Sequence, residues 1–96
     1  MRVRWLRRAL ANLEEEAQYI AADNPAAASK TVATIFAAVD RLAHHPAMGR
    51  IGRVPGTREL AVSSTPYVIP YGVRGCVLEI LRVFHGARQW PSQFEK

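Results

Sequence analysis

The stretch CVLEILRVFHGARQWP, residues 76 to 91, decides the fold because most of its first nine residues are apolar. A strand with apolar residues on both faces is typical of the centre of a sheet, where its neighbours and a covering layer bury it. We therefore expect 76–84 to be a central strand. The same stretch places Arg82 inside the apolar run and continues into His85 and Arg88, which raises the question of what a guanidinium does there.

Two further strand candidates precede it, RELAVS at 58–63 and YVIPYGV at 67–73. Turns are expected at 64–66 and at 74–75, where serine, threonine, proline and glycine gather. Pro70 interrupts the second candidate, and proline cannot donate to a strand ladder. We expect a bulge at Pro70, or a position where the missing N–H faces no neighbour.

The first half of the chain reads as one short strand and two helices. Residues 1–5 alternate basic and apolar side chains, as a half-buried strand does. Apolar residues then recur at spacings of three and four, which predicts a helix over 7–22. Asn24 and Pro25 are typical of a helix N-cap and first helical position, so a second helix should run to about residue 44.

The resulting order β-α-α-β-β-β predicts an α+β fold, with a helical hairpin packed on a small antiparallel β-sheet. At 96 residues, the chain is expected to form one domain over 1–96. The segment 47–57 is rich in glycine and proline and carries Arg50 and Arg53, so it is predicted to be a basic loop.

Charge points to an acidic partner. The sequence has 13 Lys and Arg against 8 Asp and Glu, for a formal net charge of +5, and its pI is near 10.1. Residues 49–96 hold seven basic and three acidic groups, a net of +4, so most of the positive charge belongs to the second half. Nucleic acid or an acidic protein segment would satisfy this charge.

Cysteine use and hydropathy predict a cytoplasmic protein. Cys76 is the only cysteine, which excludes an intrachain disulfide and fits a reducing compartment, and we expect it in the core. The N-terminus lacks the apolar core of a signal peptide, and no run is long enough for a membrane span. No spacing indicates a metal or a cofactor; His44 and His45 are read as helix-end residues that complement the dipole.

Arg82 admits two interpretations. In a strand with a period of two, it shares one face with Leu78, Ile80 and Phe84, whereas Glu79 lies on the other face. The guanidinium must then meet water, an acid from elsewhere or a ligand. One interpretation is a structural arginine whose stem packs at a sheet edge while its head reaches water. The other is a side chain placed on a solvated concave face to meet an anion.

A nuclease site is one hypothesis for such a face. Cleavage of an RNA backbone needs a base, an acid and positive charge beside the phosphorane. If the strands bring Arg58, Arg82 and His85 together, the arginines would stabilise charge, and His85 with Glu59 would transfer protons. The candidate anion-binding residues are Arg50, Arg53, Arg58, Arg82 and Arg88.

Four segments in this order resemble the RelE/ParE superfamily of toxins from bacterial type II toxin-antitoxin modules. They are WLRRALANLEEEAQYIAADNPAAA from residue 5, the pattern P-x-M-G-R-x-G-R-x-P-G-T-R-E-L from residue 46, TPYVIPY from residue 65 and VLEILRVFHGARQWP from residue 77. The resemblance implies a compact microbial-ribonuclease-like toxin, bound as a hetero-oligomer by a cognate antitoxin whose C-terminal segment wraps it. RelE-like members cleave mRNA on the ribosome, whereas ParE-like members inhibit DNA gyrase.

The same resemblance assigns roles to three residues. Arg82 matches the arginine in the family's last strand, His85 lies where some ribonuclease members carry a histidine, and Arg58 matches a basic position at the start of the second strand. The strand 67–73 lacks the arginine that RelE-like nucleases place there, and no tyrosine follows His85. We therefore favour gyrase inhibition over mRNA cleavage, with a degenerate toxin that acts only as an antitoxin-bound co-repressor as the third alternative.

Overall fold

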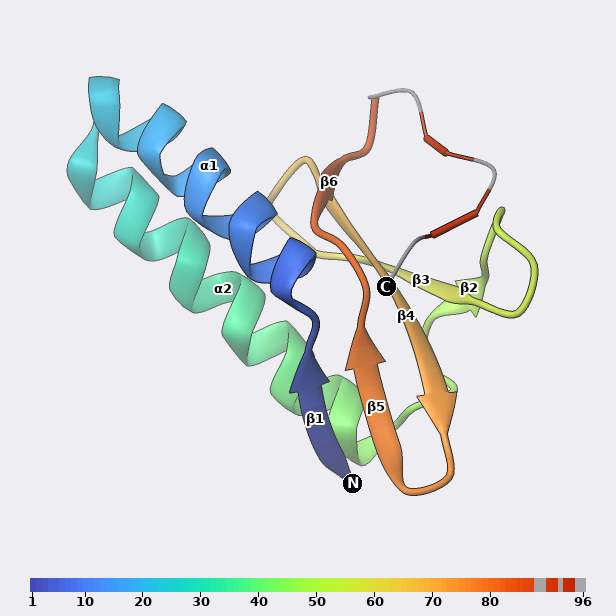
Figure 1. The fold of residues 1–96 in the computed structure, drawn as a ribbon. Helices are drawn as coiled ribbons and strands as arrows, with labels where there is room; N and C mark the ends of the chain where they lie inside the picture. Colours follow the sequence, from blue (N-terminus) through green and yellow to red (C-terminus); the bar gives the residue numbers. More distant parts are fainter. Residues whose placement is uncertain (88–89, 92, 95–96) are drawn as a thin grey trace.

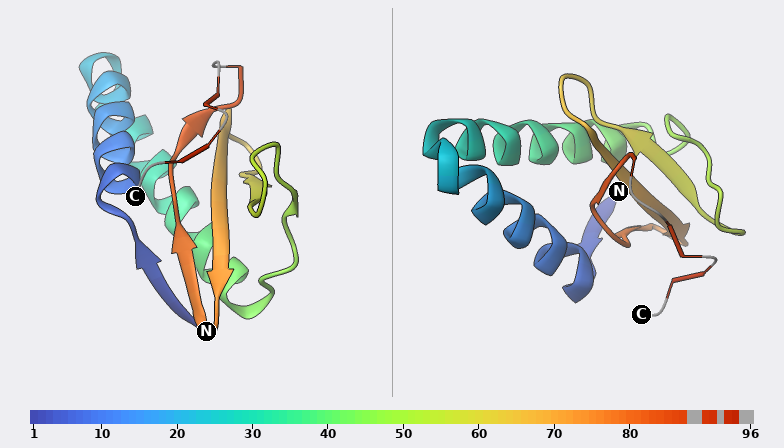
Figure 2. Two further views of the ribbon diagram at one scale, coloured as in Figure 1. Left: turned by 45° about the vertical axis from the view of Figure 1, so that its right-hand side comes forward. Right: turned by 90° about the horizontal axis from the view of Figure 1, so that it is seen from above.

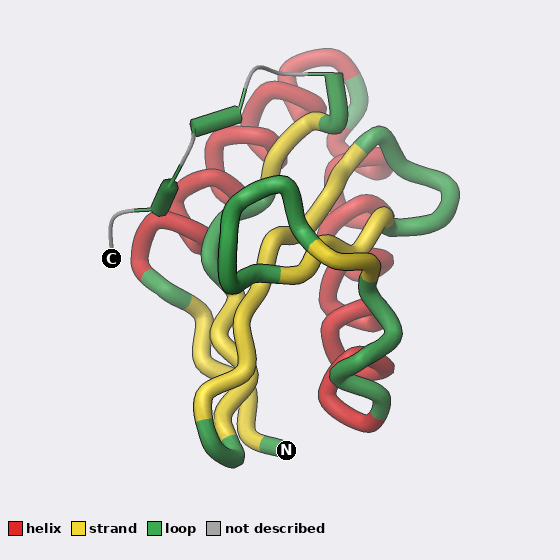
Figure 3. Tube along the Cα trace, turned by 90° about the vertical axis from the view of Figure 1, so that its right-hand side faces the viewer, coloured by secondary structure: helices red, strands yellow, loops and turns green. Residues whose placement is uncertain are grey.

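The computed structural model describes residues 1–87, 90, 91, 93 and 94. Two helices lie side by side against one face of a sheet (Figures 1 and 2). The loop between β2 and β3 projects on the side away from the helices (Figure 3). The elements are β1 (Arg2–Trp5), α1 (Arg7–Asp23), α2 (Pro25–His44), β2 (Arg50–Ile51), β3 (Arg58–Ala61), β4 (Tyr67–Arg74), β5 (Val77–Ile80) and β6 (Phe84–His85).

The α+β class and the helical hairpin are confirmed. The sheet order is β1-β5-β4-β3-β2, with β6 also paired to β4. All pairings are antiparallel except β1 with β5, which run parallel and make the sheet mixed rather than purely antiparallel. The chain between β1 and β5 includes both helices and strands β2 to β4, and so provides the long connection that a parallel neighbour requires.

The helix boundaries follow local chemistry. The side chain of Asn24 accepts a hydrogen bond from the Ala27 N–H at 3.0 Å, as an N-cap does, and Pro25 occupies the first turn of α2. By contrast, α1 begins after Leu6, which makes no side-chain cap, and Arg7 opens its first turn without any acidic residue there. None of the helices in the described residues is long and apolar enough to cross a membrane.

The core lies between the helical hairpin and the facing side of the sheet. Apolar side chains at helical spacing on α1 and α2 meet alternate residues of β4 and β5, because successive strand residues point to opposite faces. The buried members of this core are Ala9, Leu13, Ile35, Ala38, Val39, Leu42, Val62, Tyr67, Ile69, Tyr71, Leu78, Ile80 and Val83.

The predicted strand 76–84 is interrupted, and only its first part, β5, lies between two strands, β1 and β4; in the described residues β6 pairs with β4 alone. β5 ends at Ile80, which pairs with Tyr71, and β6 begins at Phe84, which pairs with Val68. Two residues of β4 therefore oppose three residues at 81–83, which is the count of a β-bulge. The bulge lies beside Pro70, whose carbonyl accepts from the Leu81 N–H at 3.0 Å.

Because of this extra residue, the prediction that Ile80 and Phe84 share one face of the sheet is wrong. Ile80 lies beside Tyr71 on the helix side, whereas Phe84 lies beside Val68 on the opposite, open face. The prediction that Cys76 lies in the core is also wrong, because Cys76 is in the turn before β5 and is exposed. Gly75 enables that turn with a φ of 60°.

Candidate anion-binding site

A groove lined by arginines opens where β1 passes into α1. Its volume is about 490 Å³, and its walls include Trp5, Leu6 and the carboxylate of Glu79. We call it the arginine groove. Its basic residues are Arg4, Arg7, Arg8, Arg74 and Arg82.

Strand pairing brings these guanidiniums together. Parallel pairing places Arg4 opposite Glu79, and antiparallel pairing brings Arg74 alongside the start of β5. Glu79 is only 7% exposed and forms ion pairs with Arg4 at 3.8 Å and with Arg74 at 3.9 Å. These ion pairs hold Arg4 and Arg74 at the groove. Arg7 and Arg8 lie there because α1 begins at Arg7, two residues after β1 ends.

Arg82 enters the groove from the bulge. The residue is 6% exposed, so it does not extend into water at a sheet edge. Its Nη1 donates to the Leu81 carbonyl at 2.6 Å, and its guanidinium carbon lies 5.3 Å from the ring centre of Phe94, in cation–π range. The bulge changes the direction of the chain at 81–83 and so decides where this guanidinium points.

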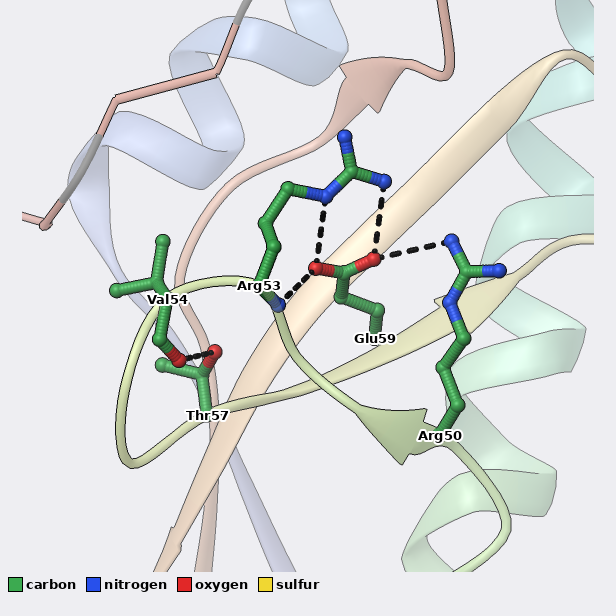
Figure 4. Close-up of polar contacts among 5 residues, drawn as sticks. All are labelled: Arg50, Arg53, Val54, Thr57 and Glu59. Atoms are coloured by element: carbon green, nitrogen blue, oxygen red, sulfur yellow. Dashed lines mark hydrogen bonds and ion pairs between the residues drawn. The ribbon is translucent and has the colours of Figure 1, made fainter.

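Glu59 forms a second charged cluster, away from the arginine groove. Its carboxylate accepts from the Arg53 backbone N–H at 2.7 Å and from the Arg53 side chain at 3.0 and 3.1 Å. Arg50 donates to the same carboxylate at 3.1 Å (Figure 4). Burial would raise the pKa of Glu59, but these hydrogen bonds outweigh it and hold the pKa below its ordinary value.

Arg58 lies on the helix side of β3, opposite Tyr71. Its Nη1 donates to the Gly49 carbonyl at 2.8 Å. Tyr71 joins the same corner, because its hydroxyl donates to the Pro46 carbonyl at 2.7 Å and accepts from the Gly49 N–H at 3.0 Å. Burial raises the pKa of Tyr71, although the Gly49 N–H and the Arg58 charge oppose that shift. Arg58 therefore contributes to the packing of this corner.

His85 lines a different cavity, of about 320 Å³, beside α1. Its Nδ1 accepts from the Ala87 N–H at 3.2 Å, and its ring meets that of Tyr67 edge to face at 6.0 Å. The Tyr67 hydroxyl donates to Glu16 at 3.0 Å. The cavity thus presents an imidazole, a phenol and a carboxylate on the helix side.

The structure does not bring the three predicted catalytic residues together. Arg58 and His85 pair with positions of β4 that lie four residues apart, which is roughly 13 Å along a strand. They also lie on opposite sides of β4, because β3 and β6 flank different edges. Arg82 lines the arginine groove, whereas His85 lines the cavity beside α1.

The remaining predicted residues have structural contacts or lie outside the description. Arg50 and Arg53 bind Glu59, and the guanidinium of Arg53 stacks 3.8 Å above the Trp90 ring. Arg88 lies outside the described residues. The anion-binding roles of these arginines stay predictions. In the described part of the chain, no group of three His, Cys, Asp or Glu side chains is placed to hold a metal ion.

Sequence reasoning missed most of the arginine groove. Arg4, Arg7, Arg8 and Arg74 come from three separate elements, and only tertiary pairing makes them neighbours. One signal was present: basic residues in the first turn of α1 oppose the positive end of the helix dipole, so they favour a nearby anion.

The family model and the two relatives that match this chain are all described as toxins. A family model described as the ParE toxin of the type II toxin-antitoxin system parDE matches residues 3–90. Putative toxin Y4kP of Sinorhizobium fredii (strain NBRC 101917 / NGR234) is 51% identical over 91 residues, which are 95% of this chain and 94% of that protein. Toxin RelE2 of Caulobacter vibrioides is 39% identical over 84 residues, 88% of this chain and 93% of that protein.

A solved structure supports the same likeness. A chain of the chromosomal ParDE TA system from P. aeruginosa superposes with a TM-score of 0.79 at 32% sequence identity. The match covers 88% of this chain and 95% of that chain. The similarity therefore extends over nearly the whole fold.

Proposed function

This chain belongs to the ParE toxin family of type II toxin-antitoxin systems, and from this premise we propose that it arrests bacterial growth by inhibiting DNA gyrase. Membership in the family implies an antitoxin partner. The proposed toxin acts by binding, in the way that its resemblance to ParE-like members implies, and a cognate antitoxin neutralises it.

The observation that supports this proposal is that the predicted proton-transfer groups, Glu59 and His85, and the predicted cationic group Arg58 lie apart in the structure. Glu59 is 2% exposed and is held by Arg50 and Arg53, so its carboxylate has no access to a substrate hydroxyl. Arg58 pairs with Tyr71 in the middle of β4, whereas His85 pairs with Tyr67 at its start, across the other edge of the strand. General acid–base cleavage needs these groups within hydrogen-bond reach of one phosphate. The arrangement therefore favours a binding toxin over a nuclease.

The test uses the purified chain with purified gyrase and supercoiled plasmid. We expect inhibition of supercoiling and accumulation of gyrase-linked, cleaved DNA. In cells, induction should trigger the DNA-damage response before translation falls, and co-expression of the cognate antitoxin should prevent both effects. Full gyrase activity at a large molar excess of the chain would contradict the proposal.

Ribosome-dependent mRNA cleavage is the second candidate function. The 39% identity to a protein named Toxin RelE2 is the observation that supports it. On this alternative, induction should stop translation quickly and produce cuts inside translated mRNA. His85→Gln and Arg82→Ala should each abolish those cuts while the fold survives. Undiminished cleavage in both variants would exclude this assignment.

A third candidate is a degenerate toxin that acts only as an antitoxin-bound co-repressor. On this alternative, induction would cause no growth defect at all. The antitoxin would then bind its operator more tightly with the chain than without it, which a gel-shift titration measures.

A further inference from the structure

The arginine groove lies on the open face of the sheet, on the side away from the helices. Val3 and Trp5 of β1 pack against the core, so Arg2 and Arg4 point to the opposite face. The strand register places Glu79 of β5 directly beside Arg4 on that face. The guanidiniums therefore stand above the surface of the sheet rather than at its edge.

Two rows of side chains cross this open face from β1 through β5 to β4. The first row is Arg2, Val77 and Arg74, and the second is Arg4, Glu79 and Gly72. From the spacing of strands and of alternate residues, the Cα atoms of Arg2, Arg4 and Arg74 lie within about 12 Å of one another. Three exposed guanidiniums thus gather over a small area of the sheet.

A second cavity extends the arginine groove over these rows. Its volume is about 280 Å³, and Arg4, Arg74 and Glu79 line both cavities. We call the two cavities together the arginine face. Its charged residues are Arg2, Arg4, Arg7, Arg8, Arg74, Arg82 and Glu79.

Glu79 orients two of these guanidiniums and leaves them accessible. Its side chain is only 9% exposed and lies 3.8 Å from Nη1 of Arg4 and 3.9 Å from Nε of Arg74. The side chains of Arg4 and Arg74 are themselves 69% and 72% exposed. Both distances are longer than a hydrogen bond, so N–H donors of these guanidiniums remain for a ligand. Side chains that are already oriented lose less entropy when they bind.

The start of α1 adds positive charge at one end of the arginine face. Arg7 and Arg8 are exposed there, and Leu6 at the N-cap position provides no side-chain cap. Basic residues at the positive end of a helix dipole destabilise the free helix. An anion bound by these arginines would relieve that repulsion.

The open face favours a phosphodiester backbone over a polypeptide. β5 pairs with β1 on one side and with β4 on the other, so its main-chain groups are used within the sheet (Figure 1). A polypeptide laid across this face would meet side chains without main-chain partners. A phosphodiester needs only cationic donors, and a guanidinium binds phosphate through two parallel N–H···O bonds.

We infer that the arginine face binds the phosphate backbone of duplex DNA and so holds the DNA on which gyrase acts. This inference rests on the proposed inhibition of gyrase, because gyrase brings duplex DNA to the complex. A toxin that contacts both gyrase and its DNA gains affinity from two linked surfaces. Phosphate contacts carry no sequence information, so the chain should bind DNA of any sequence.

Gly72 offers a way to change the charge of the arginine face without disturbing the fold. It lies in the same row as Arg4 and Glu79, and a Cβ added there would meet nothing within 4 Å beyond its chain neighbours. Gly72→Glu therefore places a carboxylate beside the arginines. Gly72→Gln is its matched control, because the two side chains have the same size and differ in charge.

The probe is a fluorescein-labelled DNA duplex, titrated with the full chain and followed by anisotropy. At about 50 mM salt we expect a Kd of about 10 μM or lower, as for a protein that contacts several phosphates. Gly72→Glu should bind at least about fivefold more weakly than Gly72→Gln, because its carboxylate repels the phosphates. Equal affinity of these two variants would overturn the inference, as would no binding by the unmodified chain at about 100 μM.

Matched double variants separate a local site from overall charge. Arg2→Gln with Arg7→Gln removes two exposed charges from the arginine face, whereas Lys30→Gln with Arg41→Gln removes two from α2. Loss of two phosphate contacts should reduce the slope of log K against log salt by about 1.8, since each contact contributes about 0.9. The α2 variant should keep the slope of the unmodified chain. Equal changes in both double variants would overturn the inference, and circular dichroism melts check that both remain folded.

Three competitors distinguish DNA from other ligands. A duplex with methylphosphonate linkages keeps the bases without the backbone charge, so it should not displace the labelled DNA. Polyglutamate of equal charge should compete more weakly than DNA, because a flexible chain loses entropy when it is ordered. Tighter binding of polyglutamate would assign the arginine face to an acidic protein segment and overturn the inference. Tighter binding of duplex RNA than of DNA would assign it to RNA, with the same consequence.

A gyrase assay with the same variants separates this inference from the proposed function. Gly72→Glu should produce less gyrase-linked, cleaved DNA than Gly72→Gln. If the chain inhibits gyrase and the two variants act equally, the inference is contradicted and the proposed target stands. If the chain binds DNA as described and leaves gyrase fully active, the proposed target is contradicted and the DNA-binding face stands.

Discussion

At the scale of single residues, Glu59 anchors the loop between β2 and β3. Its carboxylate accepts hydrogen bonds from the backbone and side chain of Arg53 and from Arg50. Both guanidiniums are partly exposed, at 63% and 42% of their side chains, so water screens part of the attraction. The carboxylate itself is buried, which makes its hydrogen bonds the more important contribution.

The pH dependence of stability follows from the lowered pKa of Glu59. A carboxyl whose folded-state pKa lies below its ordinary value of 4.5 stabilises the fold above that pH, and the contribution is lost as pH falls through the folded-state pKa. We expect the free energy of unfolding to fall on acidification below about pH 4.5. Urea denaturation across this range measures it.

Glu59→Gln should lower the free energy of unfolding at neutral pH by about 1–3 kcal/mol, because charged hydrogen bonds to a buried group are lost. The variant should also lose part of the acid dependence. Glu15→Gln, at an exposed position of α1, is the matched control and should change stability by less than about 0.5 kcal/mol. A Glu59→Gln protein as stable as wild type at neutral pH would contradict this account.

At the scale of elements, the bulge at 81–83 joins β5 to β6 and shifts the alternation of side chains, so that Ile80 and Phe84 lie on opposite faces of the sheet. Helix α1 supports it, because the side chain of Asn12 accepts from the Val83 N–H at 3.2 Å. Val83 itself is fully buried, so this N–H has no access to water. The contact couples α1 to the segment that positions Arg82 and His85.

Asn12→Ala should destabilise the fold by about 1–3 kcal/mol, because it leaves a buried N–H without an acceptor. Asn12→Asp keeps the oxygen acceptor and should retain most of the stability. Guanidinium denaturation of both variants measures the difference. Equal stability of the alanine and aspartate variants would show that the Asn12 oxygen does not support the bulge.

At the scale of the whole molecule, positive charge gathers on one part of a small domain. The arginine groove carries five arginines and one carboxylate, whereas in the Glu59 cluster Arg50 and Arg53 both bind the one carboxylate. Like charges held together destabilise the free protein, and an acidic partner relieves this cost. The free toxin is therefore expected to be less stable than its complex.

Antitoxin binding should raise the melting temperature in a concentration-dependent way. At a free antitoxin concentration of about 100 times Kd, linkage predicts about 2.7 kcal/mol of added stability. Differential scanning calorimetry with the cognate antitoxin measures it. An unrelated acidic protein of similar net charge is the control. A melting temperature that does not change with antitoxin would contradict the proposed pairing.

The helices and their boundaries were predictable because their signals are local. Apolar spacing marks the buried faces of α1 and α2, and Asn24 with Pro25 marks the start of α2 within a few residues. The central position of β5 also followed from its apolar composition, since only a strand between neighbours buries both faces. The sequence by itself thus determined the α+β class, the helical hairpin and the interior position of β5.

The site required tertiary structure because it depends on pairings between distant segments. One extra residue at 81–83 reversed the predicted face of Phe84, and a single-residue change in register has this effect wherever side chains alternate. Glu59 became a structural carboxylate only because the loop with Arg53 folds back over it. Parallel pairing of β1 with β5 then placed Arg4 beside Glu79 and Arg74, which no local pattern encodes.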